Sequence, residues 1–379
     1  MTTPFEQAAP LDPDGTDFPQ SIRQEALRMM KAPHAARVLA TLLLRSSDSL
    51  PLIDLARASI ALRASAPQDR FVWEATDDMV YSQVPAWHWK MLQDEARSKA
   101  YRQAIEGNVK PGMLVLEIGA GTGLLAMMAA RAGAKHVVTV EENPLMAEIA
   151  KSCIALNGFA DRITVVTGHS TDLVVGETLP RRADLLVHEI LSSSVVTEGM
   201  LPSIAHARAA LLTPEAKLLP DRIEIHAALS GDVLATGIPW WSVEGLDLTP
   251  IATIDAATQG VPGLAPRKRL SPPVHIADVD LMDPNFGDQQ IYHSTLLADQ
   301  MGTATGTERW MNILFPGGIS LTSDDPMSHW GTCYTPFAAS RNVQEGDKVM
   351  IETIRGAEKM STGLAQEELC AEGRWTPGL

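Results

Sequence analysis

The most regular hydrophobic pattern lies in the middle of the chain. Apolar runs at 113–118, 136–140 and 163–166 alternate with helix-like stretches, of which 124–132 is rich in small and apolar residues. Short apolar runs of this kind are typical of buried parallel strands, and their alternation with helices predicts a doubly wound sheet. We therefore expect an α/β fold whose ligand lies at the carboxyl ends of the strands.

The region before this sheet has a different periodicity. Residues 1–18 are rich in Pro, Asp and Thr and predict an unstructured arm, whereas apolar residues between 21 and 66 recur at three- and four-residue steps and predict three short helices. These helices carry no clustered acidic, His or Cys side chains, so we interpret them as a packing or dimerisation surface. Residues 81–106 predict an amphipathic helix with Asp94, Arg97 and Tyr101 on one face.

After residue 218 the pattern changes to short alternating runs, such as 222–227 and 349–354, broken by Gly, Pro and Asp. Alternation with a period of two predicts antiparallel strands, here in a β-barrel or sandwich. The expected organisation is an N-terminal arm and helical module at 1–75, the α/β domain at 76–219 and the barrel domain at 220–379. The basic cluster Arg267-Lys268-Arg269 is interpreted as part of a solvated loop.

The composition favours some classes of protein and partner over others but does not identify a function. Of the 379 residues, 45% are hydrophobic, which indicates a packed protein of more than one domain. Lys and Arg total 31 and Asp and Glu 46, so the net charge is −15, which disfavours nucleic acid as a partner and mildly favours a cationic one. Cys153, Cys333 and Cys370 are spaced for neither a metal site nor a disulfide framework. No leader pattern and no apolar run of about eighteen residues is present, so we expect no membrane partner and a cytoplasmic location.

A glycine-rich turn follows the first predicted strand. Glu117, near the end of that strand, precedes Gly119, Gly121 and Gly123, and Glu141 ends the next strand. Because the glycines alternate strictly and Glu117 would lie unfavourably close to a pyrophosphate, the turn matches the dinucleotide fingerprint poorly. A carboxylate at position 141 is placed to accept hydrogen bonds from both ribose hydroxyls of an adenosine. The pattern therefore favours an adenosine-type cofactor, with S-adenosyl-L-methionine ahead of NAD.

Two acidic residues, Glu189 and Glu198, follow about seventy residues later in the same α/β block. A strand end that places one carboxylate and a short loop that returns a second form an acceptor that fits the planar five-donor fork of a guanidinium. Two acidic residues nine positions apart also occur by chance, so the pair alone does not make a site. Beside the glycine turn, it predicts an enzyme that holds an arginine side chain next to its cofactor.

Together these motifs resemble the protein arginine methyltransferase family. The shared pattern is, in order, Met91-Leu92-x-Asp94-x-x-Arg97-x-x-x-Tyr101, the glycine turn after Glu117, Glu141, the double-glutamate loop 189–198 and Ser328-His329-Trp330. The stretch 240–251 is similar to the family's dimerisation arm, and the likeness covers about residue 78 to the C-terminus. It implies a Rossmann-like methyltransferase sheet followed by an antiparallel β-barrel, and a homodimer with its arm near 238–265. The N-terminal helices stay unexplained by it.

The resemblance also implies a role for each matched residue. Glu189 and Glu198 would clamp the substrate guanidinium, and His329, paired with Asp94, would remove a proton, so these four are the expected catalytic residues. Arg97 would bind the carboxylate of the cofactor's methionine moiety. The further expected contacts are Met91, Glu117, Gly119, Gly121, Gly123, Glu141, Ser170 and Thr171 for the cofactor, and Tyr81 and Trp330, with both glutamates, for the substrate.

The chain departs from the family pattern at three places. Ser328 replaces a threonine, the family often has a glutamate near Thr171, and the glutamate loop carries Ile190 and three serines where many relatives have bulky aromatics or a methionine. The stretch 191–196 is closer to the branch that adds a single methyl group.

The sequence therefore leads to one hypothesis with open alternatives. We expect S-adenosyl-L-methionine-dependent methyl transfer, mainly of one methyl group, to a terminal guanidino nitrogen of arginine, either in a protein or peptide or as free L-arginine. A non-catalytic adaptor that binds arginine-containing tails is the alternative. It is disfavoured because Arg97, Glu141, both glutamates and His329 are all present. A nicotinamide-dependent dehydrogenase is disfavoured by the glycine spacing.

Overall fold

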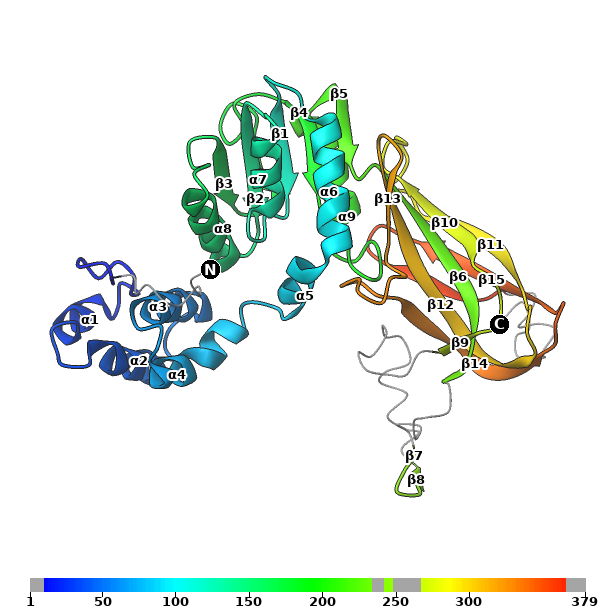
Figure 1. Cartoon of the computed structure of the whole chain (residues 1–379), viewed down its shortest axis with the longest axis horizontal. Helices are drawn as coiled ribbons and strands as arrows, with labels where there is room; N and C mark the ends of the chain where they lie inside the picture. Colours follow the sequence, from blue (N-terminus) through cyan, green and yellow to red (C-terminus); the bar gives the residue numbers. More distant parts are fainter. Residues whose placement is uncertain (1–9, 234–241, 248–266, 366–379) are drawn as a thin grey trace, which may run out of the picture.

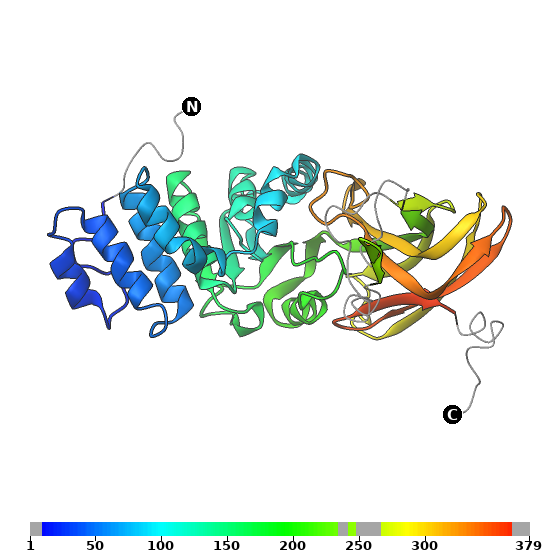
Figure 2. The same cartoon turned by 90° about the horizontal axis from the view of Figure 1, so that it is seen from below.

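The computed structural model describes residues 10–233, 242–247 and 267–365, which form three parts in a row (Figure 1). A helical module lies at one end, a parallel sheet with its helices in the middle, and curled antiparallel sheets at the other end. The same order is clear when the molecule is seen from below (Figure 2). The parallel sheet therefore lies between the helical module and the antiparallel sheets.

Within the described residues the N-terminal module has four helices where the sequence predicted three. They are α1 (Arg23–Met29), α2 (Ala35–Arg45), α3 (Leu52–Ser65) and α4 (Arg70–Tyr81). The first three confirm the prediction for 21–66, whereas α4 was not predicted and continues past residue 75. Asp69 begins it, because its side chain accepts a hydrogen bond from the Phe71 amide. The four helices bury their apolar faces in a core that includes Leu39, Leu43 and Leu55, and Phe18, only 1% exposed, joins this core from the segment that the sequence predicted to be unstructured.

The central sheet has the strand order β3-β2-β1-β4-β5 with every pair parallel. Its strands are β1 (Leu114–Ile118), β2 (His136–Glu141), β3 (Ile163–Thr167), β4 (Ala183–His188) and β5 (Leu212–Leu219), and its helices are α6 (Glu95–Asn108), α7 (Leu124–Arg131), α8 (Pro144–Leu156) and α9 (Met200–His206). The predicted doubly wound sheet is confirmed. The strand order reverses between β1 and β4, where such sheets bind ligands.

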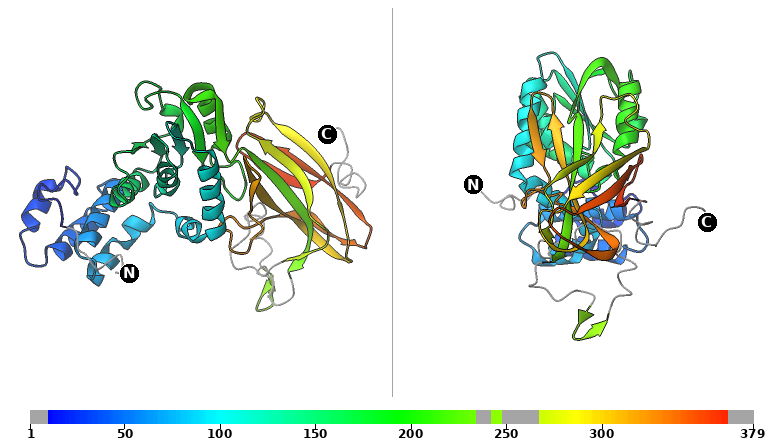
Figure 3. Two further views of the ribbon diagram at one scale, coloured as in Figure 1. Left: turned by 45° about the horizontal axis from the view of Figure 1, so that its top comes forward. Right: turned by 90° about the vertical axis from the view of Figure 1, so that its right-hand side faces the viewer.

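The third part consists of antiparallel strands, as predicted. The larger sheet contains β6 (Arg222–Val233), β9 (Arg267–Arg269), β10 (Val274–Asp280), β12 (Gly302–Phe315), β13 (Ile319–Thr322) and β14 (Cys333–Val343), and the smaller one β11 (Gln290–Leu297), β15 (Lys348–Arg355) and β16 (Met360–Leu364). The expected dimerisation arm at 238–265 lies mostly outside the described residues. Its short hairpin, β7 (Ser242–Val243) and β8 (Leu246–Asp247), projects from the body of the barrel (Figure 3).

The interpretation of the basic cluster as a solvated loop is wrong for Arg269. This residue ends β9, where its Nε donates to Glu308 at 2.8 Å and its Nη1 to Asp324 at 2.8 Å. Its guanidinium also lies 4.3 Å from the centre of the Trp310 ring. The sequence around Arg269 could not indicate these partners, because Glu308 on β12 and Asp324 in the loop after β13 are distant along the chain.

The sheet and the barrel share one continuous hydrophobic core. Tyr101 on α6 meets Phe315 on β12 edge to face, with ring centres 5.0 Å apart, and its hydroxyl donates to the carbonyl of His188 at the end of β4. Aromatic pairs and buried hydrogen bonds of this kind fix the relative position of the elements that carry them. The first turn of α6, which carries Asp94 and Arg97, is therefore held against both the sheet edge and the barrel.

Candidate active site

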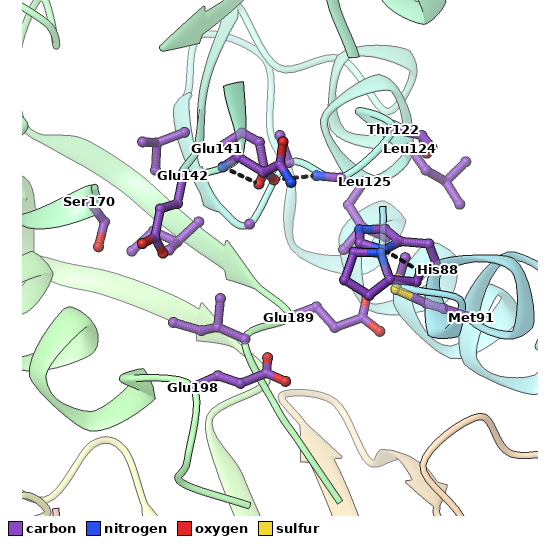
Figure 4. A pocket seen from close by; sticks show the side chains of 18 of the residues that line it. His88, Met91, Thr122, Leu124, Leu125, Glu141, Glu142, Ser170, Glu189 and Glu198 are labelled. Atoms are coloured by element: carbon purple, nitrogen blue, oxygen red, sulfur yellow. Dashed lines mark hydrogen bonds between the residues drawn. The ribbon is translucent and has the colours of Figure 1, made fainter. Parts of the chain in front are cut away.

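A cavity of about 750 Å³ opens at the carboxyl ends of β1, β2 and β4. Helix α5 (Trp87–Gln93) forms part of its wall. Figure 4 shows Glu189 and Glu198 near each other at one end, with Glu141 across the cavity from them. The expected site residues that line the cavity are Met91, Arg97, Gly119, Gly121, Glu141, Ser170, Glu189 and Glu198.

The turn after β1 needs glycine for two reasons. Gly119 and Gly123 have φ angles of +88° and +77°, which side chains rarely adopt. A Cβ atom at Gly119 would also lie 3.2 Å from the Cγ2 atom of Ile190, and one at Gly123 would lie 3.0 Å from the Cδ1 atom of Ile154. The turn therefore brings the backbone close to the cavity while α7 and α8 pack tightly behind it.

The carboxylate of Glu141 is held by backbone donors. Its Oε2 accepts from the Gly121 amide at 2.8 Å and its Oε1 from the Asn143 amide at 2.9 Å. Burial raises the pKa of Glu141, and the two amide hydrogen bonds oppose that effect. Each carboxylate oxygen has a further lone pair, so Glu141 can accept hydrogen bonds from ligand hydroxyls without moving.

At the other end of the cavity, Arg97 and Glu189 form a buried ion pair. The two side chains are only 3% and 4% exposed. Arg97 Nε donates to Glu189 Oε1 at 2.6 Å, and Arg97 Nη2 donates to Glu189 Oε2. Arg97 Nη1 is buried and has no hydrogen-bond partner among the described residues. Glu189 thus binds a guanidinium with both oxygens, while the arginine keeps one unused donor.

Asp94 joins this ion pair to the barrel. Its Oδ1 accepts a hydrogen bond from the Arg97 amide at 2.9 Å and so caps the start of α6. Its Oδ2 lies 3.2 Å from the His329 amide nitrogen and 3.0 Å from His329 Nδ1. His329 Nε2 in turn lies 3.7 Å from Glu189 Oε1. Burial lowers the pKa of His329, although Asp94 opposes this, so the ring is neutral at neutral pH. With Nδ1 donating to Asp94, Nε2 is available to accept a proton.

Glu198, the second carboxylate of the predicted substrate clamp, differs from Glu189. It is exposed to the cavity and makes no hydrogen bond or ion pair within the part of the chain that the structure describes. The protein around the carboxyl group nevertheless raises its pKa by desolvation. Glu198 is therefore an unengaged acceptor that prefers a positively charged partner.

Other expected site residues lie outside the cavity wall. Glu117 is fully buried behind the glycine turn, and burial raises its pKa to about 8. Trp330 donates from Nε1 to the Leu191 carbonyl at 2.7 Å, so it supports the glutamate loop from behind. Tyr81 is 60% exposed at the end of α4. The expected residues that do not line the cavity are Tyr81, Asp94, Glu117, Gly123, Thr171, His329 and Trp330.

The structure also adds residues to the cavity wall that the sequence did not single out. They include Ile53, Gln83, Trp87, His88, Glu142 and Asn143. The aromatic cluster at 87–89, directly before Met91, was a signal that could have indicated the α5 residues. Nothing in the sequence indicated Ile53, because it comes from the N-terminal module.

The described residues contain neither a cluster of metal ligands nor a membrane-spanning helix. No group of three or more His, Cys, Asp or Glu side chains there is arranged to hold a metal ion. None of the helices in the described ranges is both long and apolar enough to cross a membrane.

Comparison with known proteins agrees with the site geometry. A family model described as ribosomal protein L11 methyltransferase (PrmA) matches residues 100–211. An arginine N(omega)-methyltransferase of Streptomyces achromogenes subsp. streptozoticus is 35% identical over 279 residues, covering 71% of this chain and 75% of that protein. A probable histone-arginine methyltransferase 1.3 of Arabidopsis thaliana is 34% identical over 264 residues, covering 63% of this chain, and the chain spans only 48% of its length.

The fold has solved counterparts as well. The Trypanosoma brucei PRMT1 enzyme-prozyme heterotetrameric complex with AdoHcy matches with a TM-score of 0.60 at 22% identity, covering 71% of this chain and 87% of that chain. This likeness concerns the fold alone. The sequence relationship to the Streptomyces enzyme goes further, and by it the chain belongs to the arginine N-methyltransferase family of enzymes.

Proposed function

We propose that this protein transfers a methyl group from S-adenosyl-L-methionine to a terminal guanidino nitrogen of arginine. The observation that carries the proposal is the bidentate contact between Glu189 and the guanidinium of Arg97. It supports a role in guanidinium binding for this carboxylate, which lies at the end of the cavity next to His329. The adaptor alternative does not require a proton acceptor at this place.

The residues around the cavity fit such a cofactor. Arg97 Nη1 is a buried donor without a partner in the described chain, and the cofactor's amino-acid carboxylate would supply one. Glu141 would accept from the ribose hydroxyls, and the turn at Gly119 and Gly121 leaves room for the nucleoside. When bound, the cofactor supplies an electrophilic methyl group. The AdoHcy in the solved trypanosome complex belongs to that protein and supports the same cofactor class here.

The two glutamates address the weakness of the nucleophile. A guanidinium nitrogen is a poor nucleophile because its lone pair is delocalised and its pKa exceeds about 12. Hydrogen bonds from two substrate nitrogens to Glu189 fix its orientation, and Glu198 attracts positive charge toward the far nitrogens. Electron density then remains on the attacking nitrogen. Arg97 competes for Glu189 in the present conformation, so a ligand carboxylate that draws Arg97 away also frees Glu189.

The product must lose one proton after the new N–C bond has formed. His329 Nε2 lies 3.7 Å from Glu189 Oε1, beside the place where the guanidinium would bind. Asp94 holds Nδ1 as the protonated nitrogen and stabilises the imidazolium that forms. The proton therefore passes from the methylated nitrogen to His329 and then to solvent.

The form of the substrate is a finer part of the proposal. A guanidinium can be presented by a protein or peptide or by free L-arginine, and we propose that mainly one methyl group is added. The support for a single addition is the sequence of the glutamate loop, whose stretch 191–196 is closer to the branch of the family that adds one methyl group. We also propose a homodimer, supported by the projecting hairpin β7–β8. Light scattering that finds only monomers over a wide concentration range would contradict the homodimer.

One assay tests the chemistry. The protein is incubated with methyl-labelled S-adenosyl-L-methionine and, separately, free L-arginine, an arginine-rich peptide and its lysine counterpart, and the products are identified by mass. We expect one labelled methyl group on an arginine guanidinium in at least one of the first two reactions. Methylation of the lysine peptide alone would overturn the guanidinium argument, and a dominant dimethylated product would overturn the single addition.

A further inference from the structure

The helical module packs directly against the helix that follows the predicted ribose carboxylate. A small separate core joins Ala56 of α3 and Val84 to Leu145 and Met146 of α8, and the partly buried side chains of Ile53, Ile60 and Ile149 pack around it. Ala56 and Leu145 are 0% and 1% exposed. Helix α8 starts at Pro144, only three positions after Glu141. The module therefore rests on the part of the sheet that shapes one end of the cavity.

The module also contributes to the cavity wall. Ile53 from α3 lines the same cavity as Glu141, and so do Gln83 and Pro85, which lie in the link that leads from α4 to α5. Because α3 packs on α8, these residues close the side of the cavity next to Glu141. An apolar side chain and backbone at that position exclude water from whatever Glu141 binds.

A chain of hydrogen bonds connects the module to Glu141. Asn143 Nδ2 donates to the Gln83 carbonyl at 2.8 Å, and the Asn143 amide donates to Glu141 Oε1 at 2.9 Å. Asn143 Oδ1 accepts from the amides of Leu145 and Met146 and so caps α8. Asn143 thus caps α8 and donates to the carboxylate of Glu141. Its own side chain is held by Gln83, which directly follows the module.

We propose that the N-terminal helical module is a structural part of the cofactor site: through Ile53 and the Gln83–Asn143 bond it closes and positions the end of the cavity that contains Glu141. The inference rests on the proposed function in so far as the ligand of this end is the nucleoside of S-adenosyl-L-methionine. Asn143 is a positioning residue in this scheme, because it acts through Glu141. The sequence had suggested only a packing or dimerisation role for these helices.

The first test removes the apolar wall. Ile53→Ala shortens a side chain that both packs on α8 and lines the cavity, whereas Leu52→Ala makes a similar truncation at the neighbouring, 49% exposed position of the same helix. We expect the Kd of S-adenosylhomocysteine, measured by calorimetry, to rise about three- to tenfold in Ile53→Ala and to stay at the wild-type value in Leu52→Ala. In turnover, the loss should fall on the KM of the cofactor.

The second test removes the hydrogen bond between Asn143 and Gln83 and leaves Ile53 in place. Asn143→Ser keeps an oxygen cap for α8 and the backbone bond to Glu141 but loses the donor to Gln83. Its matched control is Asn157→Ser at the exposed far end of the same helix, where the side chain donates to the Cys153 carbonyl at 2.8 Å. We expect a Kd about three- to tenfold higher for Asn143→Ser only, with the Tm values of the two variants close together.

The outcomes separate the two proposals. If the wild-type protein does not bind S-adenosylhomocysteine, the proposed function fails and this inference with it. If the wild type binds and both Ile53→Ala and Asn143→Ser bind equally well, the function stands and the module is not part of the site. Equal weakening in the test and control variants would show a general loss of stability and would also overturn the inference.

Discussion

The two ends of the cavity hold their carboxylates in different ways. At one end Glu141 accepts from two backbone amides, that of Gly121 in the turn after β1 and that of Asn143 in the turn after β2. At the other end Glu189 is held by the side chain of Arg97 from α6, and His329 Nε2 of the barrel lies 3.7 Å from its Oε1. A backbone amide cannot turn away from its acceptor, whereas a side chain can exchange partners. The first end is therefore suited to bind a ligand that stays in one place, and the second to exchange one cation for another during a reaction cycle.

The sharpest test of this difference is Glu189→Gln. We expect kcat/KM to fall by about 10³-fold, because the neutral amide neither orients a guanidinium with two acceptors nor stabilises its charge. The same change releases Arg97, so S-adenosylhomocysteine should bind at least as tightly as in the wild type. Steady-state kinetics and calorimetry measure the two effects.

The control for that experiment is Glu148→Gln on α8, which changes an exposed carboxylate in a surface ion pair with Lys151. It should leave both quantities unchanged. Near-normal turnover in Glu189→Gln would remove the proposed mechanism. A large loss of cofactor affinity in that variant would instead show that the two ends are not independent.

Asp94→Asn should have the second largest effect. Asparagine can still cap α6. Its amide group, however, disfavours the tautomer in which His329 Nδ1 donates, so Nε2 becomes protonated and cannot accept another proton. We expect kcat to fall about 10²-fold with a small change in cofactor Kd.

A comparison with His329→Gln shows whether the two residues act as a unit. The double variant should then be no slower than the slower of the two single variants, because members of one unit are not additive. Fully multiplicative losses would contradict a shared role in proton transfer.

Glu141→Gln probes the other end. We expect the Kd of S-adenosylhomocysteine to rise about tenfold, because a charge-assisted acceptor is lost and the new amide group faces a backbone donor. At saturating cofactor, kcat should change much less than in Glu189→Gln. An effect on kcat as large as that of Glu189→Gln would contradict the view that the Glu141 end only binds the cofactor while the Glu189 end takes part in the reaction.

The same difference explains what the sequence could predict. The sequence could predict that Gly119, Gly121, Gly123 and Glu141 lie at one edge of the sheet, because they belong to two consecutive β-α units whose strand and turn patterns are readable from consecutive residues. The contact of Glu189 with Arg97 was not foreseen, since the resemblance assigned Arg97 to the cofactor and Glu189 to the substrate. Ile53 was missed entirely. An amphipathic helix shows in the sequence that it has a buried face, but not which element covers that face.

The smallest effect concerns pH and involves Glu198. Desolvation raises the pKa of this carboxyl group, so its proton stays bound to a higher pH than in a free glutamate. Only the ionised form attracts a guanidinium. We therefore expect kcat/KM for the arginine substrate, measured at saturating cofactor, to fall as pH decreases through that raised pKa. A bound cation favours the ionised form, so the acid limb of kcat should lie at lower pH than the limb of kcat/KM.

Glu141 also has a raised pKa, again mainly from burial, and could produce a similar acid limb. The two sources can be separated with Glu141→Gln, assayed at its own saturating cofactor concentration. If Glu198 sets the limb, this variant keeps the wild-type profile for the arginine substrate, because the only titrating group removed belongs to the cofactor end. Loss of the limb in Glu141→Gln would assign it to the nucleoside end. The acid sensitivity would then arise from cofactor binding, and Glu198 would have to be ionised over the whole working range.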